Sequence, residues 1–165
     1  MHKRIGTLGT IAVLLAAVGL IAVQSIASAD SKVRTVRLSG ANELAPTTLE
    51  PGAGDPDGSG RAKVRVDDEA GTVCFTVSWQ DIASPTMAHI HDGNASENGP
   101  VVVTLFDNGA SSPLPATIHS VKGCAEGVAA ALAEDIQKHP REFYVNVHNT
   151  EFPGGAIRGQ LKRPK

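Results

Sequence analysis

Two histidines separated by one residue are the side chains of this sequence with the clearest capacity for chemistry. His89 and His91 flank Ile90, and Met87 precedes them at the same spacing. On a β-strand, residues i and i+2 point to the same face, so Met87, His89 and His91 are expected to project side by side. Ala88 and Ile90 then point the other way, towards a core. Imidazole nitrogens bind copper or zinc, and a thioether is a soft ligand that favours Cu(I).

A third histidine lies near the C-terminal end of the chain on another alternating segment. Residues 141–148 alternate between apolar and polar side chains, and His148 falls on the polar face. If this segment lies beside the earlier histidine strand, three imidazoles converge and could hold one copper or zinc ion. The alternative is a structural role, in which the imidazoles form hydrogen bonds with loop carbonyls or with carboxylates such as Asp92 and Glu151.

Short alternating segments recur along the chain and predict the strands that must position these histidines. Besides the His89 segment, they cover residues 32–38, 61–66, 72–79, 101–106, 116–121, 141–148 and 156–161. Residues 126–138 carry apolar side chains at helical spacing and end before Pro140, which predicts the single helix. Seven or eight short strands with frequent turns and one helix predict an all-β fold, an antiparallel Greek-key β-sandwich of the immunoglobulin or superoxide dismutase kind.

The N-terminal segment has the pattern of a secretory signal peptide. Two basic residues precede an uncharged, mostly apolar run over residues 8–26, and residues 27–29 provide an Ala-Ser-Ala cleavage site. We therefore expect residues 1–29 to be a signal peptide and residues 30–165 to be one exported domain, secreted or held in the cell envelope and not membrane-bound after cleavage. The alternative is an uncleaved anchor, because the apolar run approaches the ~20 residues that span a bilayer.

Export changes the interpretation of the two cysteines, Cys74 and Cys124. In an oxidising compartment, an isolated cysteine pair most often forms one disulfide. Closing a loop of this length would stabilise the fold by about 4 kcal/mol in the chain-entropy description. The alternative, a pair of thiolate metal ligands, is disfavoured because zinc sites usually pair their cysteines locally.

Composition and missing motifs narrow the functional classes. The chain has 165 residues, of which 19% are charged, and a net charge of −2. Nothing in this balance suggests the clustered basic face of a nucleic-acid-binding protein. There is no nucleophile elbow and no cysteine near a histidine in a recognisable catalytic motif. We therefore expect a protein that is not an enzyme, with an unknown extracellular protein or a metal ion as its partner.

Five sequence blocks follow one another in an order typical of a known family. They are LSGANEL at residues 38–44, AHIHDG at 88–93, NGPVV at 98–102, FYVNVHN at 143–149 and FPGGAIRGQL at 152–161. Together they resemble the CHRD family, the domain named after chordin and also found alone in secreted bacterial proteins. Asn149 departs from the family pattern, in which threonine is common, and residues 44–46 replace the usual Val-Pro-Pro. The resemblance implies an exported Greek-key β-sandwich with no established catalytic activity.

The histidine pattern is also similar to that of copper-zinc superoxide dismutase, another Greek-key β-barrel. That family combines a His-x-His strand with a distant Val-His pair, but its zinc loop of His and Asp ligands has no counterpart in this sequence. Dismutase activity is therefore not expected. We expect a secreted, non-catalytic binding or structural module of the CHRD type. The alternative is a copper- or zinc-binding protein that uses a three-histidine site, with Met87 as a further ligand.

Overall fold

The structure, a computed structural model, describes residues 33–163. The signal peptide predicted for residues 1–29 lies outside these residues. The strands are β1 (Arg34–Ser39), β2 (Ser59–Asp67), β3 (Thr72–Gln80), β4 (Pro85–Asp92), β5 (Val101–Asp107), β6 (Ser120–Ala125), β7 (Phe143–Asn149) and β8 (Ile157–Gln160). The helix α1 spans Ala130–Lys138, and two short 3-10 helices, η1 and η2, span Gly40–Asn42 and Pro140–Glu142.

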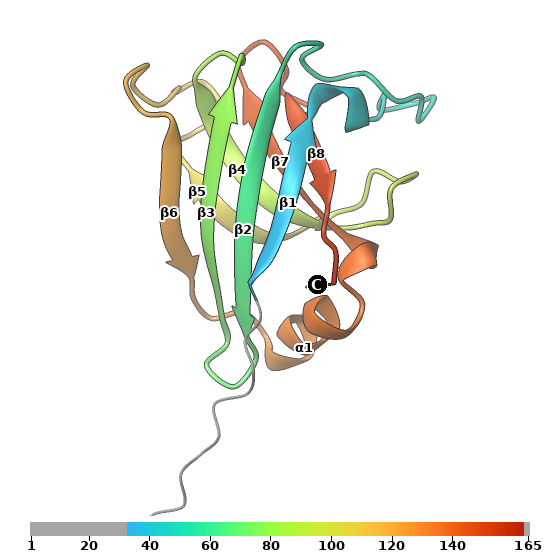
Figure 1. Ribbon diagram of the computed structural model, residues 1–165, viewed down its shortest axis with the longest axis vertical. Helices are drawn as coiled ribbons and strands as arrows, with labels where there is room; N and C mark the ends of the chain where they lie inside the picture. Colours follow the sequence, from blue (N-terminus) through green and yellow to red (C-terminus); the bar gives the residue numbers. More distant parts are fainter. Residues whose placement is uncertain (1–32, 164–165) are drawn as a thin grey trace, which may run out of the picture.

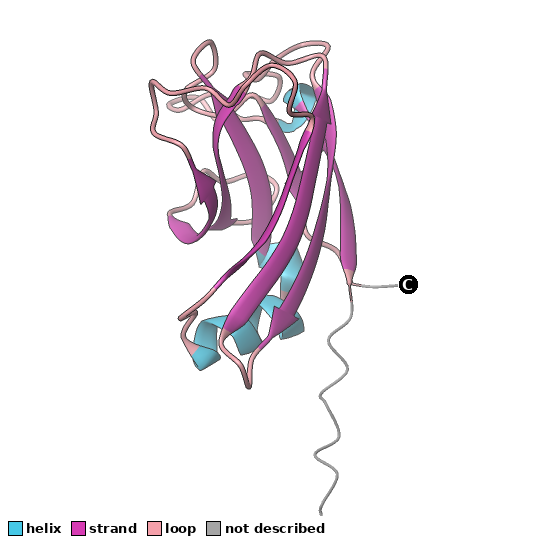
Figure 2. Cartoon of the chain, turned by 90° about the vertical axis from the view of Figure 1, so that its left-hand side faces the viewer, coloured by secondary structure: helices cyan, strands magenta, loops and turns pink. Residues whose placement is uncertain are grey.

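All eight strands belong to one antiparallel sheet, in the order β5-β4-β7-β8-β1-β2-β3-β6 (Figure 1). Strand twist accumulates across the sheet, and the sheet curls until Cα atoms of the edge strands β5 and β6 approach within 8 Å (Figure 2). The rings of Trp79 on β3 and Phe106 on β5 lie 6.3 Å apart between centroids. The predicted antiparallel all-β fold with one short helix is confirmed. The predicted two-sheet Greek-key sandwich is not, because one continuous ladder forms a barrel-shaped sheet.

Alternate residues of the strands fill the interior of this barrel. The buried side chains include Val36, Leu38, Ala62, Val64, Val66, Val73, Val77, Ile90, Val145, Val147 and Ile157. Ala133 and Ile136 of α1 join the same core at one end of the barrel. Because apolar side chains occupy the inside, the polar residues that alternate with them on β4, β7 and β8 lie on the outer face of the sheet.

Two elements differ most in extent from the predicted ones. The last strand before the helix covers residues 120–125 instead of 116–121, because its pairing with β3 places Cys124 directly opposite Cys74. The helix begins at Ala130 instead of residue 126, since Gly127 has a left-handed φ of 70° that interrupts helical backbone. No helix within residues 33–163 has the length and apolarity needed to cross a bilayer.

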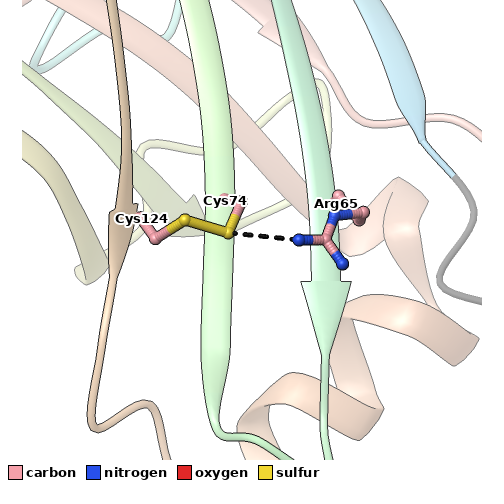
Figure 3. Close-up of a disulfide and its surroundings, with 3 residues drawn as sticks. All are labelled: Arg65, Cys74 and Cys124. Carbon is pink, nitrogen blue, oxygen red and sulfur yellow. Dashed lines mark hydrogen bonds between the residues drawn. A yellow bond between two sulfur atoms is a disulfide. The ribbon is translucent and has the colours of Figure 1, made fainter. Parts of the chain in front are cut away.

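Cys74 and Cys124 form the predicted disulfide, which joins β3 to the edge strand β6 (Figure 3). Their Cα atoms are 3.9 Å apart, and 50 positions separate them in the sequence. The Arg65 guanidinium donates a hydrogen bond of 3.5 Å to the Cys74 Sγ atom. The crosslink therefore fixes an edge strand whose other side has no neighbour in the hydrogen-bonded sheet.

Candidate metal centre

The histidine cluster is built by two neighbouring strands, β4 and β7. Six of their side chains share the outer face in three directly opposite couples: Met87 with His148, His89 with Asn146, and His91 with Tyr144. Residues directly opposite each other on an antiparallel pair point to the same face. The alternating residues of both strands point into the core, as the sequence pattern predicts. Strand pairing therefore brings together three histidines that are distant in the sequence.

The three imidazoles are close enough to share one ion. One ring nitrogen from each of His89, His91 and His148 can be chosen so that all three lie within 4.8 Å of one another. The His89 Nδ1 atom is 3.1 Å from the His148 Nε2 atom. All three side chains are at most 9% exposed. Bond lengths of about 2.0–2.1 Å allow two ligand nitrogens to be at most about 4.2 Å apart, so the rings would have to draw slightly closer around an ion.

Backbone carbonyls fix the orientation of two of these rings. The His91 Nδ1 atom lies 2.8 Å from the Gly99 carbonyl oxygen, and the His148 Nδ1 atom lies 3.0 Å from that of Pro153. A carbonyl can only accept, so both Nδ1 atoms donate, and the neutral rings carry their lone pairs on Nε2. Metal-binding histidines commonly donate their other N–H group in this way.

The His91 Nε2 lone pair has no donor among the described residues, and the donor available to that of His148 is the Nδ1–H group of His89. The His91 Nε2 atom is buried without a hydrogen-bond partner among the described residues. The His148 Nε2 atom faces the Asn146 Oδ1 atom at 3.0 Å, besides His89. Two acceptors facing each other are unfavourable, so either the Asn146 amide turns to present its N–H group or a cation lies between them. The cluster is thus rich in acceptors and poor in donors, which suits a cation.

Burial keeps the histidines in the neutral form that ligates metals. Burial lowers the pKa of His89 to about 4, with smaller contributions from the positive forms of His148 and His91. Burial is also the largest cause that lowers the pKa values of His91 and His148, although their hydrogen bonds to carbonyl oxygens oppose it. All three rings are therefore neutral imidazoles at neutral pH, and none has to lose an imidazolium proton before an ion binds.

A stack of side chains supports His91. Its ring lies parallel to that of Tyr144, with centroids 4.7 Å apart and an angle of 11° between the planes. The Arg158 guanidinium lies 3.4 Å from the centroid of the Tyr144 ring. Arg158 also donates hydrogen bonds to Asn98 Oδ1 and to the carbonyl oxygens of Asn94 and Glu97. It thereby holds the loop that carries the Gly99 carbonyl over the cluster.

The remaining predicted residues lie at the margin of the cluster. Met87 is half-buried, directly opposite His148 in the β4–β7 ladder. The carboxylates of Asp92 and Glu151, named from the sequence as hydrogen-bond partners, are exposed, and the histidines use loop carbonyls instead. Backbone carbonyls carry no side-chain signature, which explains why the sequence could not identify Gly99 as a partner.

A pocket of about 450 Å³ opens beside the cluster and is lined by His91, Tyr144 and Asn146 on its inner side. Glu43 also lines it and is 4% exposed, and its Oε1 atom has no hydrogen-bond partner among the described residues. Burial raises the pKa of Glu43 to about 8, although the positive charge of Arg158 opposes this. The pocket gives small solutes a route to the edge of the histidine cluster.

Asn146, Tyr144 and Glu43 lie at the site although no sequence pattern indicated a role for them. Asn146 and Tyr144 could have been found as neighbours of His148 on the polar face of the same alternating strand. Glu43 lies on a loop after β1, and no periodic pattern connects it to the histidines. Only the folded chain places it in the same pocket as His91.

Comparisons with known proteins support the resemblance of the sequence blocks. No curated protein and no solved structure matches the chain. A family comparison matches residues 34–161 to the CHRD domain, from the first strand to just beyond the last. Because this match covers most of the sequence and all eight strands, the chain belongs to the CHRD domain family.

Proposed function

We propose that this CHRD domain is an exported, non-catalytic binding module that holds one copper or zinc ion between His89, His91 and His148. The observation that carries the proposal is the convergence of three ring nitrogens within 4.8 Å. Imidazole is a preferred ligand of both ions. All three side chains are at most 9% exposed, whereas histidine as a residue type is only intermediate in burial.

The orientation of the rings supports the same proposal. Hydrogen bonds to the carbonyls of Gly99 and Pro153 direct two Nε2 lone pairs towards the cluster. Buried polar atoms are normally hydrogen-bonded, so the unpartnered His91 Nε2 atom calls for a partner. A metal ion supplies one without a proton.

The three histidines would coordinate an ion through three nitrogens and leave one coordination position open. Zinc sites of this type keep a fourth position for water or another ligand, and the Asn146 Oδ1 atom is near enough to the His148 ring to contribute an oxygen. The thioether of Met87, opposite His148, would favour Cu(I) if its side chain turns towards the ion. A Met87→Leu variant should therefore weaken Cu(I) binding while leaving Zn(II) binding unchanged.

Export is proposed on two grounds. The sequence of residues 1–29 has the pattern of a signal peptide. The Cys74–Cys124 disulfide is of the kind that persists in oxidising compartments. Periplasm, cell envelope or external medium would each provide such conditions.

Calorimetric titration of the exported protein with Zn(II) and with Cu(II) tests the proposal. We expect one ion per chain, with binding weakened at least about a hundredfold in His91→Gln and His148→Gln. His119→Gln is the matched control, because His119 is exposed and lies outside the cluster. If the wild type binds neither ion and the two variants only lower its stability, the histidines are a structural brace between loops.

A further inference from the structure

The outer face of β1, β2, β3 and β6 carries a cluster of positive charges. This face is turned towards the viewer in Figure 1. Its exposed cations are Arg37 on β1, Arg61 and Lys63 on β2, and Lys122 on β6. We call these four residues the basic face. Within the four strands, the only carboxylate on the same side is Asp67, at the far end of β2.

Strand register makes the four charges neighbours. Arg37 lies directly opposite Arg61, and Lys63 follows two residues later on the same side. Lys63 is opposite Thr76, which in turn is opposite Lys122. Like charges directly opposite each other destabilise a sheet. None of the four forms a salt bridge with a described residue, so the repulsion is not offset within residues 33–163.

A hollow lies at one end of the basic face. It encloses about 680 Å³ and is lined by Arg37, Arg61, His119, Ser59, Ser78 and Ser120, among others. Its lining comes mainly from β1, β2, β3 and β6 and includes none of the proposed metal ligands, which lie on β4 and β7. Two guanidinium groups beside several hydroxyls can bind an acidic group and sugar hydroxyls together.

The chemistry of the face distinguishes between classes of polyanion. Base stacking on single-stranded nucleic acid needs exposed aromatic rings, and Trp79, the aromatic residue that lines the hollow, is 5% exposed. Insertion at a membrane surface needs several exposed apolar side chains beside the cations. Here Val33 is exposed near Lys63, but the outward neighbours on the strands include Thr35, Thr76 and Ser78. A face of cations and hydroxyls fits a chain of acidic sugars best.

We propose that the basic face binds an acidic polysaccharide, with one sulfate or carboxylate held between Arg37 and Arg61 in the hollow. Further acidic groups along the polymer contact Lys63 and Lys122. This site is separate from the histidine cluster, so it does not depend on metal binding. It would attach an exported protein to an anionic cell-surface or extracellular polymer.

Binding of dextran sulfate and of polygalacturonate, with neutral dextran as a blank, tests this inference in the wild-type protein and three variants. We expect both acidic polymers to bind, and the double variant Arg61→Glu with Lys63→Glu to bind at least about tenfold more weakly. The matched control is Arg141→Glu, since Arg141 is an exposed cation on η2, outside the face. The conservative pair Arg61→Lys with Lys63→Arg should retain binding, which separates loss of charge from misfolding.

Salt dependence provides a second measurement. The logarithm of the affinity should fall linearly with the logarithm of the salt concentration, and the charge-reversed variant should show a shallower slope. Equal binding of neutral dextran, or unchanged affinity in the charge-reversed variant, would overturn the proposal. Tighter binding of duplex DNA or of anionic lipid vesicles than of either acidic polysaccharide would overturn the assignment of the ligand.

Discussion

The Nδ1 atom of His89 lies 3.1 Å from the Nε2 atom of His148, although 59 positions separate the two residues in the sequence. This approach follows from the pairing of β4 with β7, which places the two rings on one face. Because the His148 Nδ1 atom donates to a carbonyl, its Nε2 atom can only accept in the neutral form. The metal-free pair is therefore joined by a hydrogen bond from the His89 Nδ1–H group, and His89 can ligate an ion through Nδ1 when its proton is on Nε2 instead.

Acidification should destabilise the metal-free protein through His89. Its pKa is about 4 in the folded chain and about 6.5 in an unfolded one. Between these values the unfolded chain binds more protons than the folded chain. The free energy of unfolding therefore rises with pH in this window and decreases as the pH falls. The shift corresponds to roughly 3 kcal/mol at most. Urea denaturation at pH 7 and pH 4 should show a smaller loss in His89→Gln than in wild type, and equal losses would refute this role.

The buried carboxyl group of Glu43 should have the opposite effect on how stability depends on pH. Its pKa is raised to about 8 in the folded chain, so between about pH 4.5 and 8 the folded chain binds more protons than the unfolded one. The free energy of unfolding therefore falls as the pH rises through this range. Glu43→Gln should gain stability relative to wild type on going from pH 5 to pH 9, as measured by urea denaturation. Glu151→Gln, at an exposed position in the same pocket, is the control; parallel profiles for wild type and Glu43→Gln would contradict the prediction.

Arg158→Lys should loosen the loop over the histidine cluster. Lysine cannot reproduce the planar fork that donates to three oxygens of residues 94–98 and stacks on Tyr144. We expect a loss of about 2 kcal/mol in the free energy of unfolding and faster hydrogen exchange in residues 93–100. Arg141→Lys, at an exposed position, should change neither quantity. Unaltered exchange in Arg158→Lys would show that the loop is held by other contacts.

Removal of the disulfide should lower the free energy of unfolding without changing the affinity of the histidine cluster for a metal ion. The crosslink closes a loop of 50 residues, worth about 4 kcal/mol in the chain-entropy description. The double variant Cys74→Ser with Cys124→Ser should unfold at lower urea concentration. Its metal affinity should be unchanged, because the crosslink joins β3 to β6 and neither strand carries one of the three histidines. Lost metal affinity in a folded double variant would contradict the separation of the two features.

Local patterns were sufficient to predict most strands and the faces on which the histidines lie. Alternation along residues 87–91 and 141–148 assigned the histidines to the polar side, and the structure places Ile90 and Val145 in the core as that pattern requires. The curvature of the sheet could not be predicted in this way. It depends on the accumulated twist of eight paired strands, which no single segment records.

The candidate site was only partly accessible from the sequence. Residue types indicated the three ligands, but the distance between them depends on the pairing of β4 with β7 across a long sequence separation. The contacts that orient His91 and His148 are made by backbone carbonyls. The basic face was missed for a similar reason. The alternating cations of β2 are visible in the sequence, but their neighbours Arg37 and Lys122 are added by strand register.

X-ray absorption spectroscopy of the protein loaded with one equivalent of Zn(II) or Cu(II) tests the metal centre most directly. We expect three imidazole nitrogens at about 2.0 Å from the ion in the wild-type protein, and two in His148→Gln. A spectrum with a shell of water and carboxylate oxygens, without the scattering pattern of imidazole rings, would contradict this expectation.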